Sequence, residues 1–225
     1  MITVNNLEKI YEGDVPTKAL KGVSFSIKEG EFVGLMGRSG SGKSTLLHQL
    51  GLLDIPSTGQ IVLDSVSVLD LTQEEKTDFR LTKLGYVFQE YGLIAEFTAL
   101  ENVAFPAMAM HNDNPKEKAR ELLSFVGLEN RLSHYPHEMS GGEKQRVAIA
   151  RSLINDPKII FADEPTANLD SHSTEVVMNL FKKLHTDLRK TILLVTHELS
   201  DEKYLDRVIY LKDGAIESDK RLQAN

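Results

Sequence analysis

The segment from Gly37 to Ser44, GRSGSGKS, has the residue types and spacing of a phosphate-binding loop. Glycines let the backbone curl so that its N–H groups point at phosphate oxygens, and the following helix turns its positive end toward the same anion. We therefore predict that Lys43 reaches the β- and γ-phosphates of a nucleotide and that the Ser44 hydroxyl ligates Mg²⁺. The residues predicted to hold the nucleotide are Gly37, Arg38, Ser39, Gly40, Ser41, Gly42, Lys43, Ser44 and Thr45.

The alternative interpretation of this segment is a flexible Gly/Ser loop with a solvated lysine. The flanking residues disfavour it. The apolar run from Phe32 to Met36 predicts a buried strand before the loop, and Leu46, Leu47 and Leu50 predict an apolar helix face after it. Strand, loop and helix in this order are the context that phosphate binding requires.

A second cluster is the acidic pair Asp163 and Glu164, which follows the apolar run from Ile159 to Ala162. Strands of a parallel sheet carry their functional residues at their carboxyl ends. Asp163 is predicted to hold Mg²⁺, directly or through a water, because magnesium prefers oxygen ligands. Glu164 is placed to accept a proton from an attacking water. The alternative is a solvated Asp-Glu turn before Pro165, which the preceding buried strand disfavours.

A third segment, Met139 to Arg146, contains the capping-box pattern S-x-x-E from Ser140 to Glu143. It opens an amphipathic helix with apolar residues on one face, so one interpretation is simply a well-capped structural helix. The two glycines at the helix start also leave backbone N–H groups free to bind an anion.

With this third segment in place, the chain resembles the ATP-binding-cassette family over nearly its whole length. The signature loop of that family is L-S-G-G-Q, and here Met139 and Glu143 replace its leucine and glutamine. The resemblance implies ATP as the nucleotide, Mg²⁺ as the metal and ATP hydrolysis as the reaction. It also implies that two copies pack head to tail, so that Ser140, Gly141 and Gly142 of one copy cover the ATP of the other.

Four further residues take candidate roles from the resemblance, each with a structural alternative. Gln89 resembles the Q-loop glutamine that faces Mg²⁺ and the membrane partner, although a polar loop residue is the alternative. Asp170 resembles the D-loop aspartate at the dimer interface, and a helix-capping turn is the alternative. His197 resembles the switch histidine near the γ-phosphate, and Tyr11 the aromatic residue that stacks on adenine; structural packing is the alternative for both. The implied catalytic set is Lys43, Gln89, Glu164 and His197, and the implied magnesium set is Ser44, Gln89 and Asp163.

A narrower similarity involves the segments GYVFQ (85–89) and TALENV (98–103), together with LLDIPSTG (52–59). They resemble ATPases of the lipoprotein-releasing, macrolide-exporter and cell-division types. This implies a separate membrane permease as partner, with export or substrate extraction as the process. A nucleotide-controlled scaffold of the cell-division type, without transport, is the alternative. ATPases acting on DNA or ribosomes are disfavoured, because the chain has neither a long coiled-coil insertion nor a second cassette.

The elements that must position these residues alternate between strand and helix at both ends of the chain, with a helical block between them. We expect strands at residues 2–11, 23–27, 32–36, 84–88, 159–162 and 191–196, helices at 43–53 and 173–188, and a mainly helical stretch from 98 to 153. This pattern predicts an α/β fold with a mainly parallel sheet and an inserted helical subdomain. The resemblance implies a P-loop nucleoside triphosphatase core and an antiparallel β subdomain in addition. We expect one domain over 1–225, with a nucleotide-binding core at 1–89 and 158–225 and a helical subdomain at 90–157.

Composition limits the remaining possibilities. The chain of 225 residues has a net charge of −7, which disfavours a broad nucleic-acid-binding surface. It has no cysteine, so a disulfide framework or thiolate metal site is excluded. The sequence shows no signal-peptide pattern and no apolar run long enough to span a bilayer. Together with the membrane permease that the resemblance implies, this leads us to expect a peripheral protein on the cytoplasmic face of the cell membrane.

Overall fold

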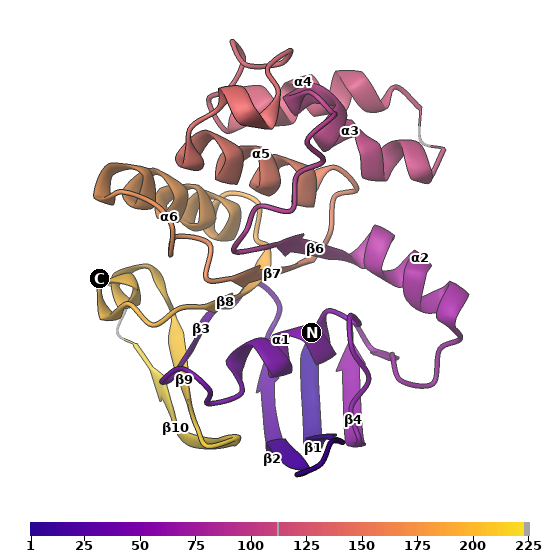
Figure 1. The fold of residues 1–225 in the computed structure, drawn as a ribbon, viewed down its shortest axis with the longest axis vertical. Helices are drawn as coiled ribbons and strands as arrows, with labels where there is room; N and C mark the ends of the chain where they lie inside the picture. The colour runs from indigo at the N-terminus through magenta and orange to yellow at the C-terminus, as the bar shows by residue number, and fades with distance from the viewer. Residues whose placement is uncertain (112, 223–225) are drawn as a thin grey trace.

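The computed structural model describes residues 1–111 and 113–222 and contains two β-sheets (Figure 1). A four-stranded antiparallel sheet has the order β2-β1-β4-β5, and a six-stranded sheet has the order β10-β9-β3-β8-β7-β6. The strands are β1 (Ile2–Tyr11), β2 (Thr17–Ile27), β3 (Phe32–Met36), β4 (Thr58–Leu63), β5 (Val66–Ser67), β6 (Leu84–Val87), β7 (Ile159–Asp163), β8 (Thr191–Val195), β9 (Arg207–Lys212) and β10 (Ala215–Arg221). This arrangement confirms the predicted fold class.

The six-stranded sheet brings the carboxyl ends of its central strands to one edge. Strands β9, β3, β8, β7 and β6 run parallel to their neighbours, and only β10 is antiparallel, to β9. The β9–β10 hairpin turns at Asp213 and Gly214, which both have positive φ, as a tight two-residue hairpin turn requires. Because parallel strands end at the same edge, the loops after β3, β7 and β8 lie close together.

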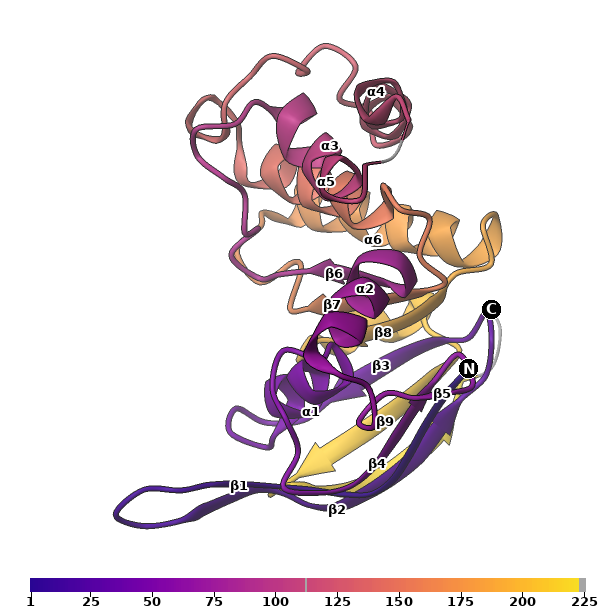
Figure 2. The same cartoon turned by 90° about the vertical axis from the view of Figure 1, so that its right-hand side faces the viewer.

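Alternate side chains of the sheet face two different hydrophobic clusters, as the period of two in a strand requires. In β3, Phe32 and Met36 join one cluster, while Val33 and Leu35 join the other. The first cluster includes buried residues of α3 (Ala99–Ala109), α4 (Pro115–Phe125), α5 (Gly141–Leu153) and α6 (Ser171–Thr186). The second includes residues of α1 (Lys43–Leu50), α2 (Gln73–Lys83) and the antiparallel sheet. Figure 2 shows the central strands between these two layers.

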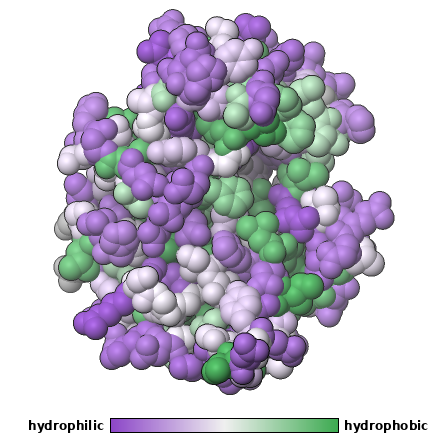
Figure 3. Space-filling model, in the orientation of Figure 1, coloured by the Kyte–Doolittle hydropathy of each residue, from purple (hydrophilic) through white to green (hydrophobic). Residues whose placement is uncertain are grey.

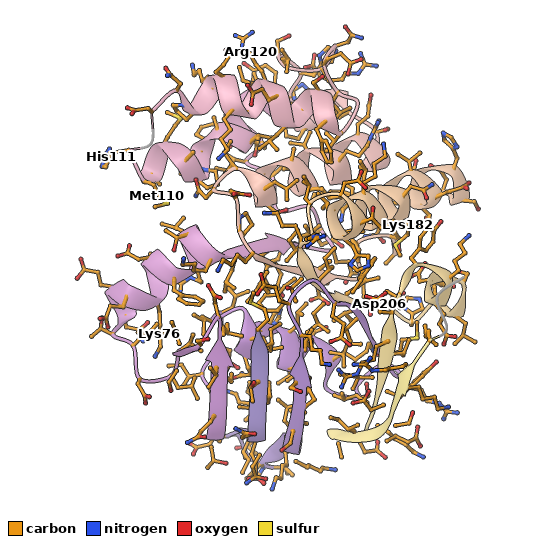
Figure 4. The ribbon with its side chains drawn as sticks, turned by 180° about the vertical axis from the view of Figure 1, so that it is seen from behind. Lys76, Met110, His111, Arg120, Lys182 and Asp206 are labelled. Carbon is orange, nitrogen blue, oxygen red and sulfur yellow. The ribbon has the colours of Figure 1, made fainter. Side chains whose placement is uncertain are left out.

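The helical layer carries charged residues on its surface. Arg120 on α4 and Lys182 on α6 are exposed and labelled in Figure 4. None of the helices in residues 1–111 and 113–222 combines the length and apolar character needed to cross a lipid bilayer.

Several predicted boundaries differ from the structure. The helix expected at 43–53 ends at Leu50, because Gly51 caps it and Leu52 turns to a φ of 56°. The strand expected from residue 23 begins at Thr17, where the chain pairs with Tyr11 of β1. The helix expected at 173–188 spans Ser171–Thr186 instead, because Asp170 caps it. The helical stretch 98–153 consists of α3, α4, the 3-10 turn η1 (Pro136–Glu138) and α5.

Candidate functional site

The loop between β3 and α1 forms a cradle that only glycine permits at two points. Gly37 and Gly42 have φ values of 151° and 101°, in a region that other residues rarely adopt. A Cβ atom at Gly42 would lie 2.7 Å from the carbonyl oxygen of Ala19, and one at Gly37 would lie 2.7 Å from the Ser41 hydroxyl oxygen. The loop is therefore folded tightly against β2 and its own next turn.

The amine of Lys43 lies across this loop. Its side chain is buried, and Nζ donates to the carbonyl oxygens of Gly37 at 2.9 Å and Arg38 at 3.1 Å. The buried Ser41 hydroxyl has no hydrogen-bond partner among the described residues. A buried hydroxyl without a partner, an amine and a glycine-lined backbone together fit a phosphate group.

The cradle opens into a pocket of about 510 Å³. Its residues come from the phosphate loop, the start of α1, β2, the end of β7 and the β9–β10 turn. They are Thr17, Lys18, Ala19, Lys21, Ser39, Gly40, Gly42, Lys43, Ser44, Thr45, Glu164, Asp213 and Gly214. The residues from Thr17 to Lys21 and the β9–β10 turn were not predicted from the sequence as part of the site. No local motif marks them, because β2 and the β9–β10 hairpin reach the loop only through tertiary packing, with the Gly214 N–H donating to Ser41 O at 3.0 Å.

Ser44 and Asp163, the two oxygen-bearing side chains that the sequence proposes as magnesium ligands, lie close together beside this pocket. The Ser44 hydroxyl donates to Oδ1 of Asp163 at 3.4 Å, which joins the start of α1 to the end of β7. His48 Nε2 lies 3.8 Å from Oδ2 of the same carboxylate. Burial raises the pKa of Asp163 and Glu164 adds to the rise, while His48 opposes it. A hydroxyl and a carboxylate at this spacing suit Mg²⁺, which takes oxygen ligands.

Glu164 and His197 come from adjacent strands and meet at the same edge. Glu164 has a φ of 41°, and its N–H donates to Val195 O at 3.0 Å, so β8 holds the turn that follows β7. Its Oε2 lies 3.4 Å from His197 Nδ1, and His197 Nε2 lies 3.3 Å from Oε1 of Glu198. Glu164 lines both the pocket around Lys43 and a neighbouring pocket of about 450 Å³ that contains His197. The structure therefore connects the acidic pair with the histidine.

Tyr11 and Gln89 are among the predicted residues that lie outside the lining of the phosphate pocket. Tyr11 is 42% exposed, and its hydroxyl donates to Oδ2 of Asp54 at 3.0 Å. Its partner across the β1–β2 ladder is Thr17, which does line the pocket. Gln89 is exposed just after the end of β6.

Ser140 and Asp170 form the paired starts of α5 and α6. Ser140 completes the predicted capping box with Glu143: each backbone N–H is bonded by the other's side chain, at 2.9 and 3.2 Å. Asp170 caps α6 by accepting from the N–H and hydroxyl of Ser173 at 2.9 and 2.7 Å. A Cβ atom at Gly142 would lie 2.6 Å from the Ser173 hydroxyl oxygen, so the two helix starts are in close contact.

Glu143, which differs from the family's glutamine, has a second partner. Its Oε1 accepts from Nε of Arg131 at 2.8 Å. The Arg131 guanidinium and the capping hydrogen bond hold the pKa of the Glu143 carboxyl below its usual range. Within residues 1–111 and 113–222, Ser140, Gly141 and Gly142 do not line the pocket around Lys43.

A strand–loop–helix phosphate cradle with an acidic pair at the end of a nearby strand defines the P-loop nucleoside triphosphatase class.

Comparisons with known proteins identify the family. The family model described as ABC transporter matches residues 20–167. An uncharacterised ABC transporter ATP-binding protein of Methanocaldococcus jannaschii is 46% identical over 99% of this chain and 98% of its own length. The chain therefore belongs to the ABC transporter family, as one of its ATP-binding ATPase subunits.

Two further similarities bear on assembly and transport. The macrolide export ATP-binding/permease protein MacB of Bdellovibrio bacteriovorus is 46% identical over 100% of this chain, which spans 34% of MacB. A solved dimer of the M. jannaschii cassette, in a post-hydrolysis state with bound ADP and Pi, has a TM-score of 0.92 at 44% identity. That alignment covers 99% of both chains.

Proposed function

We propose that the chain binds Mg-ATP at the loop before α1, hydrolyses it between two head-to-tail copies, and drives a separate membrane permease. One observation carries this proposal. The phosphate cradle, the Ser44–Asp163 oxygen pair and the Glu164–His197 pair share one sheet edge, whereas Ser140 lies with α6 outside that pocket. A site divided in this way is complete only when a second copy supplies its Ser140.

Each residue at the sheet edge has a role that follows from its position. The N–H groups of Gly37 to Ser44 and the Lys43 amine bind the β- and γ-phosphates, and Tyr11 stacks on the base beside Thr17. Ser44, Asp163 and Gln89 are the proposed magnesium ligands. Mg²⁺ held there would supply positive charge that neutralises the charge developing on the phosphate oxygens.

Glu164 acts as the general base that accepts a proton from the attacking water. Its carboxylate faces the pocket around Lys43 on one side and His197 on the other, so it lies between the phosphate site and the histidine. His197 orients this carboxylate and faces the γ-phosphate. General-base assistance of this kind contributes about 10²–10⁴ in rate.

The second copy supplies Ser140, Gly141 and Gly142 to the γ-phosphate. The N–H groups at the start of α5 are an anion site, and Ser140 fixes the first turn of that helix by its capping bond. Asp170 caps α6 directly beside it, so the proposed D-loop moves with the signature segment. The dimeric arrangement of the M. jannaschii cassette supports this assignment.

Mixing two inactive variants tests the head-to-tail site. Lys43→Ala disables the cradle of its own chain, and Ser140→Arg disables the helix start that the chain offers to its partner. A mixed dimer contains one site with neither change, so mixing should restore about a quarter of wild-type activity, because about half of the dimers are mixed and each has one intact site. If Ser140 acted within its own chain, mixing the two variants would restore no ATPase activity.

The permease is proposed to dock in a groove of about 400 Å³ between α2, β6, α3 and α5. Its lining includes Phe88 and Gly92, on either side of Gln89, and Pro106 of α3. Figure 3 shows hydrophobic residues around a hollow on this side of the molecule. Phe105 and Met108 of α3 are 46% and 47% exposed. An apolar groove next to Gln89 would link docking to the nucleotide site, with the cassette on the cytoplasmic face of the membrane.

Matched phenylalanine variants test the docking site. Phe105→Asp should abolish co-purification with the membrane subunit encoded beside this chain, whereas Phe125→Asp on α4 should not, although Phe125 is similarly exposed at 37%. Equal retention of the permease by the two variants would refute the groove. The similarity to MacB supports export as the direction of transport.

A further inference from the structure

A buried carboxylate, Asp201, lies near His197 but is not part of the ATP site described above. It belongs to the 3-10 helix η2 (Leu199–Tyr204) and is only 2% exposed. In residues 1–111 and 113–222 it forms no ion pair with a lysine, arginine or histidine. Its Oδ2 instead accepts a hydrogen bond from the Thr196 hydroxyl at 2.7 Å.

This hydrogen bond is part of a network that links the residues on either side of His197. The Thr196 hydroxyl oxygen also accepts from the N–H of Glu198 at 3.0 Å, so it joins the residue before the histidine to the residue after it. The Asp201 N–H donates to the Glu198 carbonyl oxygen at 3.1 Å, which joins Asp201 to the same network. The Thr196 N–H donates to Leu35 O at 3.3 Å and ties the segment to β3.

The His197 side chain itself is 53% exposed, and packing therefore does little to fix its position. Its distance of 3.4 Å to Glu164 depends on the backbone on either side of it, which the hydrogen bonds of Thr196 and Asp201 hold. Burial of a carboxylate is costly, and apolar replacements of buried charged groups are often neutral or stabilising. Burial also raises the pKa of Asp201, which shows that the environment penalises its charge.

We propose that Asp201 is a positioning residue for hydrolysis, which acts through Thr196 to hold His197 within reach of Glu164. The inference rests on the proposed role of His197 in hydrolysis. It assigns Asp201 no contact with the nucleotide, because Asp201 does not line the pocket around Lys43. The loss of Asp201 should therefore lower kcat and leave the KM for ATP within about twofold, since Lys43 and the phosphate loop are untouched.

Three variants separate positioning from simple packing. Asp201→Ala and Thr196→Val each remove the bond between the two side chains, and each should lower kcat by about tenfold to 100-fold, the scale of a misplaced catalytic group. Asp201→Asn keeps an oxygen that accepts from Thr196 and should restore kcat to within about threefold of wild type. An Asp201→Asn enzyme as slow as Asp201→Ala, or a Thr196→Val enzyme with unchanged kcat, would overturn the proposal.

A matched control addresses stability. Asp206, labelled in Figure 4, is another carboxylate of this region, and its Oδ2 accepts from Phe32 N–H at 2.9 Å and lies 3.5 Å from His185 Nε2. Asp206→Ala should lower Tm without lowering kcat. If Asp206→Ala slowed hydrolysis as much as Asp201→Ala, loss of stability alone would explain both effects and the proposal would fail.

A double-mutant cycle with His197→Ala tests the route of the effect. If Asp201 acts through His197, adding Asp201→Ala to His197→Ala should change kcat by less than about twofold. Multiplicative losses would show that Asp201 acts independently and would overturn the inference, while the proposed ATPase site would stand. An unchanged kcat in His197→Ala alone would instead remove the proposed role of His197, and the inference with it.

Discussion

Replacing Glu164 by glutamine should separate turnover from folding and nucleotide binding. The substitution keeps the shape of the side chain and removes its ability to accept a proton. The side chain is 21% exposed, and its ion-pair contact is His197 Nδ1 at 3.4 Å. A partly exposed pair of this kind contributes about 1 kcal/mol or less to stability, so Tm should fall by no more than about 4 °C in a domain of this size.

The effect on hydrolysis should be much larger than the effect on stability. Loss of a general base costs about 10²–10⁴ in rate, which corresponds to about 2.7 to 5.4 kcal/mol in the activation barrier. The proposed phosphate contacts of Lys43 and the proposed magnesium pair Ser44–Asp163 do not depend on Glu164, so ATP should still bind. A variant that binds ATP but hydrolyses it slowly should accumulate as the ATP-loaded dimer.

Three measurements on the purified chain check this reasoning. Phosphate release gives kcat, thermal unfolding gives Tm, and sizing chromatography with saturating ATP gives the oligomeric state. Glu198→Gln is the matched control, because Glu198 lies 3.3 Å from the other ring nitrogen of His197, and this variant should keep kcat within about threefold. An unchanged kcat in Glu164→Gln would refute the assignment of the base. A variant that stays monomeric at saturating ATP would refute the two-copy site.

Two further predictions concern the start of α5. Glu143→Gln keeps the capping pattern but removes the ion pair with Arg131. The pKa of Glu143 in the folded protein is lowered from 4.5, so its ion pair stabilises the fold fully above pH 4.5. This stabilisation is lost as the pH falls through the pKa of the folded state. Urea unfolding should therefore show a gap between wild type and variant that is constant near pH 7 and closes on acidification, and a gap that widens there would contradict the sign. Gly142→Ala places a Cβ atom 2.6 Å from the Ser173 hydroxyl oxygen and should cost about 1–3 kcal/mol in stability. It should reduce ATPase activity while fluorescent-nucleotide titration of the monomer shows unchanged affinity; equal loss of both would contradict the division of the site between two copies.

The motifs were predictable because each depends on local chemistry. The glycine spacing before Lys43, the carboxylates after an apolar strand and the capping box at Ser140 specify their own backbone conformations, and the structure contains all three. The α/β class was predictable from apolar runs that alternate with helical periodicity. The end of α1 was predicted incorrectly, because a helix pattern continues past Leu50 in sequence while Gly51 and Leu52 turn the chain.

Other parts of the site were beyond local patterns. The lining residues from Thr17 to Lys21 and the Asp213–Gly214 turn carry no nucleotide-binding motif. They reach the phosphate loop because the β9–β10 turn bonds to both β2 and the loop: Lys21 N–H donates to Gly214 O at 2.8 Å, and Gly214 N–H donates to Ser41 O at 3.0 Å. The hydrogen bond that joins Asp201 to Thr196 depends on η2 folding back onto the residue that follows β8. The contact of Gly142 with Ser173 depends on α5 and α6 meeting at their starts.

The sequence by itself determined which residues can bind phosphate, hold a metal and accept a proton, because these abilities reside in side-chain chemistry and in short-range backbone conformation. Only the tertiary structure decided which of them meet. The parallel sheet placed Lys43, Asp163, Glu164 and His197 at one edge because parallel strands end together, and it left Ser140 outside that pocket. Such proximity depends on long-range packing, which spacing along the chain does not specify.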